Sequence, residues 1–218
     1  ARAMRLLLAD DHPLFRDAMA RLVAARWPGV EVQVAADADG ALALADAQPD
    51  ADLMLLDLSM PGARGFSALV HLRALHRALP IVVVSARDDA DTRRRALDHG
   101  AAGFLSKSEP PEAVQRALQA VLDGDRLPGL GAAPIDADER AVAARIATLT
   151  PAQFRVLSRV AAGLLNKQIA WELGVGEATV KAHMGAVLEK LGATNRTQAV
   201  LMLGRLGLEP PAPVADEA

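Results

Sequence analysis

The first 122 residues alternate between short apolar runs and longer segments with helical periodicity. Runs such as Leu6 to Leu8 and Ile81 to Val84 are almost continuously apolar, which is typical of strands buried on both faces of a sheet. Five strands are predicted, at residues 4–9, 30–36, 53–56, 81–84 and 103–105. A helix is predicted after each, at residues 13–25, 40–47, 66–77, 90–99 and 111–122. This succession predicts an α/β domain, a doubly wound five-stranded parallel sheet with helices on both faces.

The alternation stops at Asp123. Residues 123–134 hold three Gly and two Pro and are interpreted as a linker, followed by a short connecting helix at residues 136–148. An all-α domain is predicted over residues 149–208, with four helices at 151–162, 167–173, 177–191 and 196–206. Thr150, Pro151 and Gln153 predict an N-cap, a first helical residue and a capping box. The Pro-rich acidic tail, residues 209–218, is expected to be disordered.

Charge separates the two blocks. The whole chain carries a net charge of −3, but residues 1–122 hold 14 Lys and Arg against 16 Asp and Glu, whereas residues 149–209 hold 7 against 4. The second block is therefore basic although the chain is acidic, so binding to nucleic acid is not excluded. Cysteine is absent, which excludes disulfides and thiolate sites. No apolar run is long enough for a membrane span, and a soluble cytoplasmic protein is expected.

Polar residues gather at the predicted carboxyl ends of the strands. In a five-stranded sheet of order 2-1-3-4-5, ligands bind at the switch point between strands 1 and 3. Strand 1 ends in Asp10 and Asp11, and strand 3 ends in Asp57. Three carboxylates at one point favour a hard divalent cation such as Mg²⁺. Ser85 after strand 4 and Lys107 after strand 5 add a hydroxyl and an ammonium, so the site is suited to a phosphoryl group on a carboxylate.

Asp10-Asp11, the run DLSMPGARG from Asp57 to Gly65, Ser85-Ala86 and the run GFLSK ending at Lys107 resemble the receiver domain of bacterial response regulators. The resemblance spans residues 4–122 and implies a flavodoxin-like receiver. It implies that Asp57 is the phosphoacceptor for a sensor histidine kinase. Mg²⁺ would be held by Asp10, Asp11, Asp57 and the backbone carbonyl of Ser59. Ser85 and Lys107 would bind phosphoryl oxygens, and Phe104 would be the aromatic that turns inward when Ser85 moves.

The predicted helices at 167–173 and 177–191 are separated by Gly174, Val175 and Gly176, a spacing typical of a helix-turn-helix. Asn166 is predicted as the N-cap of the first of these helices. The runs LTPAQ (149–153), GLLNKQIA (163–170), TVKAH (179–183), KLG (190–192) and NRTQA (195–199) resemble the LuxR-type helix-turn-helix. Together with the receiver, the chain resembles the NarL/FixJ family of response-regulator transcription factors.

This resemblance implies binding to double-stranded promoter DNA, with a homodimer as the active form and no membrane partner. Thr179, Lys181 and His183 would lie on the recognition helix, and phosphate contacts are expected from Asn166, Lys167, Lys190 and Arg196, with Lys181 able to serve either purpose. Ala182 and Gly185 replace bulkier or polar residues that the family often carries, so only modest sequence discrimination is expected.

Two other functions compete with a phosphorylation-switched transcription factor. An aspartate-based phosphohydrolase could use the same sheet, but the chain has no insertion large enough to cap a substrate, and the basic domain would have no purpose. A DNA-binding protein with a vestigial receiver is the other alternative. It is disfavoured because Asp10, Asp11, Asp57, Ser85 and Lys107 are all present. We therefore expect a regulator and not a turnover enzyme.

Overall fold

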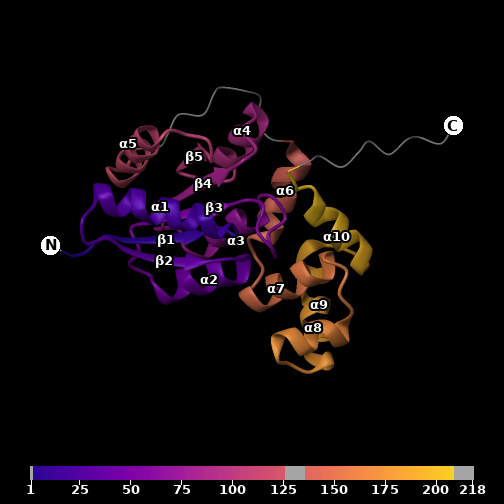
Figure 1. Ribbon diagram of the computed structural model, residues 1–218. Helices are drawn as coiled ribbons and strands as arrows, with labels where there is room; N and C mark the ends of the chain where they lie inside the picture. Colours follow the sequence, from indigo (N-terminus) through magenta and orange to yellow (C-terminus); the bar gives the residue numbers. More distant parts are fainter. Residues whose placement is uncertain (1, 126–135, 209–218) are drawn as a thin grey trace.

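A computed structural model describes residues 2–125 and 136–208 (Figure 1). Five parallel strands form one sheet in the order β2-β1-β3-β4-β5, which confirms the predicted α/β fold. The strands are β1 (Arg5–Ala9), β2 (Glu31–Ala35), β3 (Leu53–Asp57), β4 (Ile81–Ser85) and β5 (Gly103–Ser106). Ala9 is paired with Leu56 and Ser85 with Ser106, so the strands end at one common edge. None of the helices among the described residues has the length and apolar character of a membrane span.

Five helices cover the two faces of the sheet: α1 (Pro13–Arg26), α2 (Ala38–Ala47), α3 (Ser67–Leu75), α4 (Ala90–Asp98) and α5 (Pro111–Leu122). Helices α1 and α5 share one core with Leu6, Leu8 and Val82. Helices α2, α3 and α4 pack on the opposite face, against Leu7, Leu56 and other strand residues. Because alternate strand residues point to opposite faces, both cores are apolar and the sheet is buried on both sides.

The predicted helix at residues 66–77 is too long. Helix α3 ends at Leu75, because the chain must turn back toward β4 before residue 81. Arg73 stabilises this turn by donating from Nη1 to the carbonyls of Arg77 and Leu79, at 3.0 and 2.9 Å. Helix α2 starts two residues earlier than predicted, since Asp37 caps it by accepting a hydrogen bond from the Gly40 amide at 2.7 Å.

The predicted connecting helix is confirmed as α6 (Ala137–Ile146). The second domain, as far as it is described, contains only helices: α7 (Pro151–Ala161), α8 (Asn166–Leu173), α9 (Glu177–Leu191) and α10 (Arg196–Gly204). The predicted capping box of α7 is confirmed, with reciprocal bonds between Thr150 and Gln153. The prediction that Asn166 caps α8 is wrong: Leu165 occupies the N-cap position, and its amide is satisfied by Gln168 Oε1 at 2.7 Å. The predicted tail and residues 126–135 of the predicted linker lie outside the described residues.

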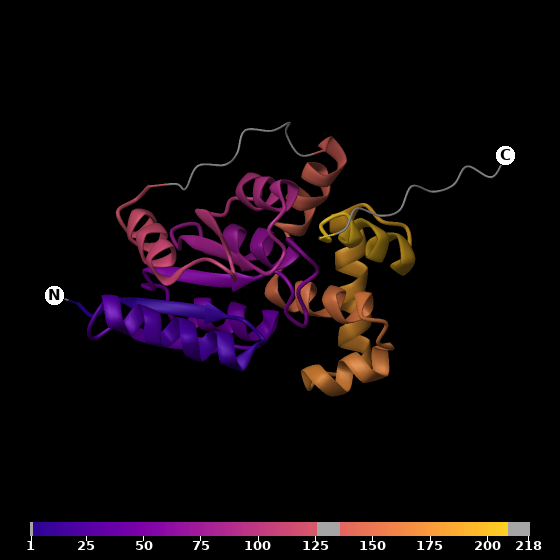
Figure 2. The same ribbon diagram turned by 45° about the horizontal axis from the view of Figure 1, so that its top comes forward.

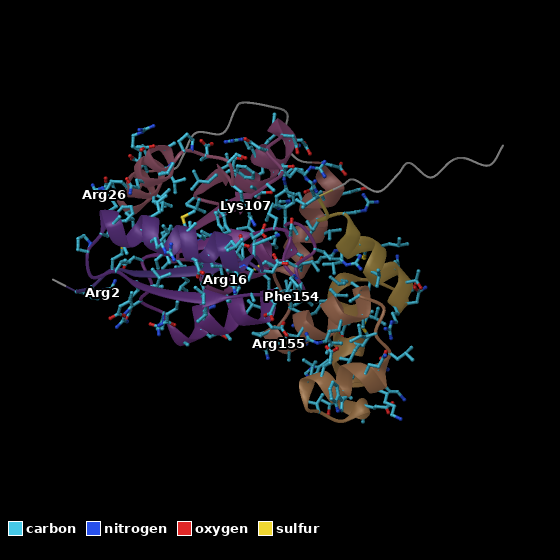
Figure 3. The ribbon with its side chains drawn as sticks, in the orientation of Figure 1. Arg2, Arg16, Arg26, Lys107, Phe154 and Arg155 are labelled. Carbon is cyan, nitrogen blue, oxygen red and sulfur yellow. The ribbon has the colours of Figure 1, made fainter. Side chains whose placement is uncertain are left out.

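Helices α6 and α7 lie against the receiver (Figure 2). One hydrophobic core continues from helices α2 to α4 into α6 and α7. Phe154 of α7 lies at this junction (Figure 3), fully buried, and stacks on the His71 ring of α3 with 4.3 Å between ring centroids. His71 Nε2 lies 2.9 Å from the Leu149 carbonyl oxygen, which fixes Nε2 as the donor. The domains are therefore packed together by apolar and polar contacts in this structure.

Candidate functional site: an acidic pocket and a helix-turn-helix

The acidic pocket forms where β1, β3 and β5 end. Asp57 is the last residue of β3, Asp10 and Asp11 follow β1, and Lys107 follows β5. Lys107 Nζ lies 3.1 Å from Asp57 Oδ2 and 2.7 Å from Asp10 Oδ2. Asp10 and Asp57 are each only 1% exposed, so the ammonium offsets charge that would otherwise be buried without compensation. The structure thus brings together four residues that the sequence placed at this edge.

Burial raises the pKa of the Asp57 carboxyl above its ordinary value of 3.8, and the hydrogen bond and charge of Lys107 act in the opposite direction. The Ser59 amide also donates to Asp57 Oδ1, at 3.2 Å, and this bond lowers the pKa. The balance matters because only the ionised carboxylate is a nucleophile. Lys107 therefore both anchors Asp57 and favours its reactive form.

His12 belongs to this cluster, although the sequence interpretation did not assign it a role. Its Nδ1 lies 3.0 Å from Asp10 Oδ1, 2.9 Å from Asp11 Oδ1 and 3.9 Å from Asp57 Oδ2. The ring is 62% exposed, so it covers the open side of the pocket. Its position next to Asp11 in the chain is a signal that could have indicated this place.

The donor set fits a hard cation. Potential ligand atoms of Asp10, Asp11, His12 and Asp57 lie within 4.8 Å of one another. Asp10 Oδ2 and Asp11 Oδ1 are buried and make no hydrogen bond of good geometry, despite the neighbouring Lys107 and His12 nitrogens. Buried carboxylate oxygens without such bonds are costly unless a cation binds them. Oxygen ligands at this density favour Mg²⁺ among the common cations.

Ser85, the last residue of β4, is fully buried, and its Oγ accepts a hydrogen bond from the Arg87 amide at 3.0 Å. Phe104 of β5 is 5% exposed, and the Arg93 guanidinium of α4 lies over its ring at 4.9 Å. Ser85 belongs to β4, which pairs with β3 beside Asp57, and Phe104 belongs to β5, the next strand after β4. In the described state the aromatic side chain is already buried beneath α4.

Helices α8 and α9 form the helix-turn-helix. Gly174 ends α8 with a φ of 64°, a left-handed conformation that favours glycine, and Gly176 is the N-cap of α9. On α9, Thr179 and Lys181 are exposed and His183 is half-buried. Val180, Met184 and Val187 form the buried face of the same helix. The exposed face of α9 is therefore available for a ligand of this domain.

The four side chains predicted to contact phosphate differ in their surroundings. Lys167 is exposed on α8, and Asn166 is half-buried with its Oδ1 3.3 Å from Arg196 Nη1. Arg196 also donates to the Leu164 carbonyl. Lys190 points back into its own domain, where Nζ donates to the Thr148 carbonyl at 2.9 Å and to Gln153 Oε1 at 2.8 Å. Lys167 and Lys190 are thus the two exposed side chains of the four, and Lys190 is held by contacts within its own domain.

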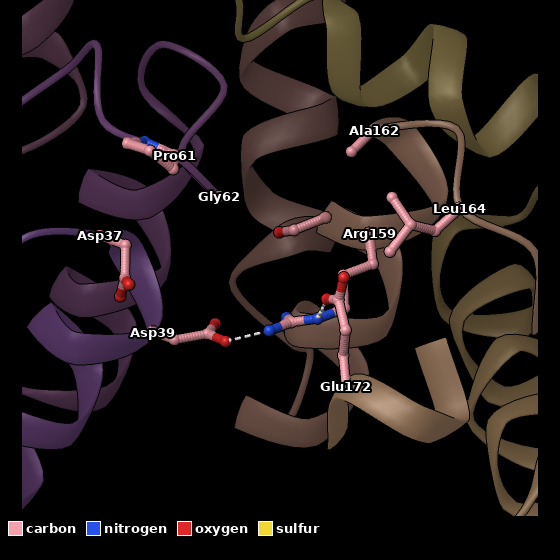
Figure 4. Close-up of a pocket in the computed structure, with 9 residues that line it drawn as sticks. Asp37, Asp39, Pro61, Gly62, Arg159, Ala162, Leu164 and Glu172 are labelled. Carbon is pink, nitrogen blue, oxygen red and sulfur yellow. Dashed lines mark hydrogen bonds and ion pairs between the residues drawn. The ribbon is translucent and has the colours of Figure 1, made fainter. Parts of the chain in front are cut away.

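The junction of the domains contains charged residues that sequence reasoning did not find. Arg159 of α7 donates to Asp39 of α2 at 2.6 Å and to Glu172 of α8 at 2.9 Å (Figure 4). These three residues border a cavity of about 260 Å³ between the domains. The pairs join residues that are far apart in the chain, so no local pattern signals them.

Comparison with known proteins gives matches for both domains. Residues 6–119 match the model of the response regulator receiver domain, and residues 147–203 match that of the bacterial regulatory proteins of the luxR family. The chain is 39% identical over 213 residues to the glycerol metabolism activator of Pseudomonas putida, covering 92% of this chain and 95% of that protein. It is 33% identical to the nitrate/nitrite response regulator protein NarL of Escherichia coli, covering 90% and 93% of the two chains.

Solved structures show the same fold. A LuxR-family two-component response regulator from an Aurantimonas species is similar with a TM-score of 0.54 at 32% identity, over 59% of this chain and 91% of that one. The RcsB response regulator of Salmonella typhimurium is similar with a TM-score of 0.52 at 23% identity, over 93% and 98% of the two chains.

Proposed function

Because the chain belongs to the response regulators with a LuxR-type DNA-binding domain, a family of phosphorylation-controlled transcription regulators, we propose that Asp57 accepts a phosphoryl group and thereby controls DNA binding by α8 and α9. The donor is a phosphohistidine on a sensor histidine kinase. The observation that carries this proposal is the buried Asp57 carboxylate, 3.1 Å from Lys107 and beside Asp10 and Asp11.

In the proposed reaction an Asp57 carboxylate oxygen attacks phosphorus, and the bond from phosphorus to the donor imidazole nitrogen breaks. The electron pair leaves with that nitrogen, which takes its proton from solvent. Lys107 stays beside the oxygens and compensates the negative charge that arrives with the phosphoryl group. The Ser59 amide holds Asp57 Oδ1, so the carboxylate is oriented before the reaction.

Mg²⁺ would be held by Asp10, Asp11, Asp57 and the backbone carbonyl of Ser59. When bound, the cation supplies positive charge that neutralises the carboxylates and the incoming phosphoryl oxygens. The two buried carboxylate oxygens without well-oriented hydrogen bonds support this assignment. Arg16 Nη1 donates to the Asp10 carbonyl at 2.6 Å and positions the backbone that carries the first two ligands.

The switch is proposed to involve Ser85 and Phe104. Ser85 would move toward the phosphoryl group and bind one of its oxygens through the hydroxyl. The displacement of Ser85 would be transmitted to Phe104 and to helix α4 above it. Ser85 Oγ accepts a hydrogen bond from the Arg87 amide, and its hydroxyl proton would be donated to a phosphoryl oxygen.

On DNA, α9 would enter the major groove, with Thr179, Lys181 and His183 toward the bases. Asn166, Lys167 and Arg196 would contact phosphates, which fix the position of the protein without reading sequence. Lys190 is left out of this proposed set because its ammonium is engaged inside the domain. The active species would be a homodimer on two half-sites, helped by the exposed face of α10 around Leu201.

The test is uptake of a phosphoryl group from phosphoramidate in the presence of Mg²⁺, followed by intact-mass analysis. Wild-type protein should gain one phosphoryl group that is labile to hydroxylamine, as an acyl phosphate is. Asp57→Asn should gain none, while the control Asp52→Asn, near the opposite end of β3, should behave as wild type. Uptake by Asp57→Asn would contradict the assignment, and continuous rapid release of phosphate by wild type would indicate an enzyme instead.

A further inference from the structure

A buried charged cluster joins helix α4 of the receiver to α6, the connecting helix, which also packs against α9 and α10 of the second domain. It consists of Arg95 and His99 from α4 and Glu139 from α6, which are 4%, 8% and 8% exposed. Arg95 Nε donates to Glu139 Oε1 at 2.9 Å, and His99 Nε2 lies 2.7 Å from the same oxygen. A buried carboxylate is costly without partners, and both of these partners come from the receiver. Glu139 is therefore stably buried only while α6 is packed on the receiver.

The end of α10 is bound at the same point. Arg95 Nη2 donates to the Arg205 carbonyl at 3.0 Å, and the Phe66 amide donates to the Leu206 carbonyl at 2.8 Å. The Phe66 ring lies under the Arg95 guanidinium at 4.6 Å and beside the His99 ring at 5.3 Å. Phe66 follows the loop that begins at Asp57. Two receiver segments thus hold both α6 and the chain after α10.

Helix α4 also contacts the phosphorylation side of the receiver. Arg93 lies over Phe104, and Arg93 and Arg95, two residues apart, project from nearly opposite sides of the helix. The N-cap of α4 is Asp89, four residues after Ser85, and its carboxylate accepts bonds from the Thr92 amide and Arg87 Nε, both at 2.9 Å. One short helix therefore contacts the switch aromatic through Arg93 and the second domain through Arg95.

We propose that Glu139, held by Arg95 and His99, is a latch that locks the second domain onto α4 until phosphorylation of Asp57 displaces that helix. The latch rests on the proposed function of Asp57. It restrains α6 and the end of α10 and leaves Thr179 and Lys181 of α9 exposed. The latch thus controls DNA binding by fixing the position of the DNA-binding domain relative to the receiver and to a second copy of the chain. It does not cover the recognition helix.

The absence of cysteine allows the latch to be tested in the full chain with two spin labels. Ala18→Cys on α1 and Trp171→Cys on α8 replace exposed residues, one in each domain. Double electron–electron resonance should give one narrow distance for unphosphorylated wild type. Glu139→Gln, which removes the charge and keeps the size, should lose this distance and give a broad distribution. Glu112→Gln on α5 makes the same chemical change at an exposed site and should retain the narrow distance.

Treatment with phosphoramidate and Mg²⁺ separates this proposal from the proposed function. Wild type should convert to the broad distribution on phosphorylation, and Glu139→Gln should change no further. If wild type takes up phosphoryl at Asp57 but unphosphorylated Glu139→Gln keeps the narrow distance, the latch is refuted while the phosphoacceptor stands. If wild type takes up no phosphoryl group, the proposed function fails and the release of the latch by phosphorylation fails with it.

A second variant tests the latch independently, in case Glu139→Gln does not fold. Arg95→Met removes the other side of the latch and leaves α6 unchanged in sequence. Circular dichroism should show native helix content, and the distance should broaden as in Glu139→Gln. A narrow distance in Arg95→Met would refute the latch even if Glu139→Gln fails to fold.

Discussion

Substitution of Lys190 tests whether this side chain stabilises the helical domain or contacts DNA. Lys190→Met retains most of the aliphatic stem and removes the ammonium that donates to the Thr148 carbonyl and Gln153 Oε1. Hydrogen bonds from charged donors contribute about 1.5–3 kcal/mol when buried, and the exposure of Lys190 reduces this. We expect the helical domain to lose about 0.5–1 kcal/mol of unfolding free energy, since contacts of exposed charges are screened by solvent. Each kcal/mol corresponds to roughly 4–8 °C in the midpoint of a domain of this size.

Thermal unfolding is followed by circular dichroism at 222 nm, because Trp171 on α8 is 85% exposed and its fluorescence would change little. In parallel, the salt dependence of DNA affinity measures phosphate contacts, because each contact contributes about 0.9 to the slope of log K against log salt. Lys190→Met should leave the slope unchanged, whereas Lys167→Met should reduce it by about 0.9 and leave the midpoint unchanged. If Lys190→Met left the thermal midpoint unchanged and reduced the salt-dependence slope, Lys190 would contact DNA phosphate and the assignment would be refuted.

Three further predictions concern stability and domain contact. Burial lowers the pKa of both His71 and His99 below 6.5, so the unfolded chain takes up protons first as the pH falls. Their contribution to stability is therefore complete above pH 6.5 and decreases below it, by up to about 1.4 kcal/mol per pH unit for each proton. Urea titrations between pH 7 and 5 should show a smaller decrease of the unfolding free energy for His71→Gln than for wild type. An equal decrease in the two proteins would contradict the assignment. Thr150→Ala removes the confirmed capping box of α7 and should cost about 1 kcal/mol in thermal unfolding, with Thr197→Ala, an exposed site on α10, as the control. Gly65 has a φ of 53°, and a Cβ at this position would overlap the Leu206 carbonyl oxygen. Gly65→Ala should therefore loosen the contact between the domains and raise the hydrodynamic radius measured by gel filtration. An unchanged radius would contradict this prediction.

The sequence predicted those features that arise from local patterns. Apolar runs gave the strands, and the first helical positions of Pro13, Pro111 and Pro151 were visible because proline at a helix start has a fixed geometry. The acidic pocket was predictable for the same reason. In a parallel sheet the carboxyl ends of the strands meet at one edge, so Asp10, Asp57 and Lys107 had to approach one another.

Features that depend on side-chain contacts made in the folded chain were not predictable. The Arg95 to Glu139 pair joins residues 44 positions apart, and neither residue lies in a pattern that differs from an exposed helix face. The engagement of Lys190 with Thr148 and Gln153 depends on how α9 crosses the start of α7. Asparagine is a typical N-cap residue, which made Asn166 the predicted N-cap of α8. Leu165 occupies the N-cap position instead, and Gln168 accepts a hydrogen bond from its amide. Tertiary contacts decided the first two cases, and a side-chain contact within the first turn of α8 decided the third.

The proposed control of DNA binding by Asp57 is tested most directly by one measurement, the fluorescence anisotropy of a DNA duplex that the full chain has selected from a random library. Affinity should be compared with and without phosphoramidate and Mg²⁺ at physiological salt, for wild type and for Asp57→Asn. Phosphorylation should raise the affinity of wild type at least tenfold and leave Asp57→Asn unchanged. Equal affinity for phosphorylated and unphosphorylated wild type, with uptake on Asp57 verified by mass, would contradict the proposed switch.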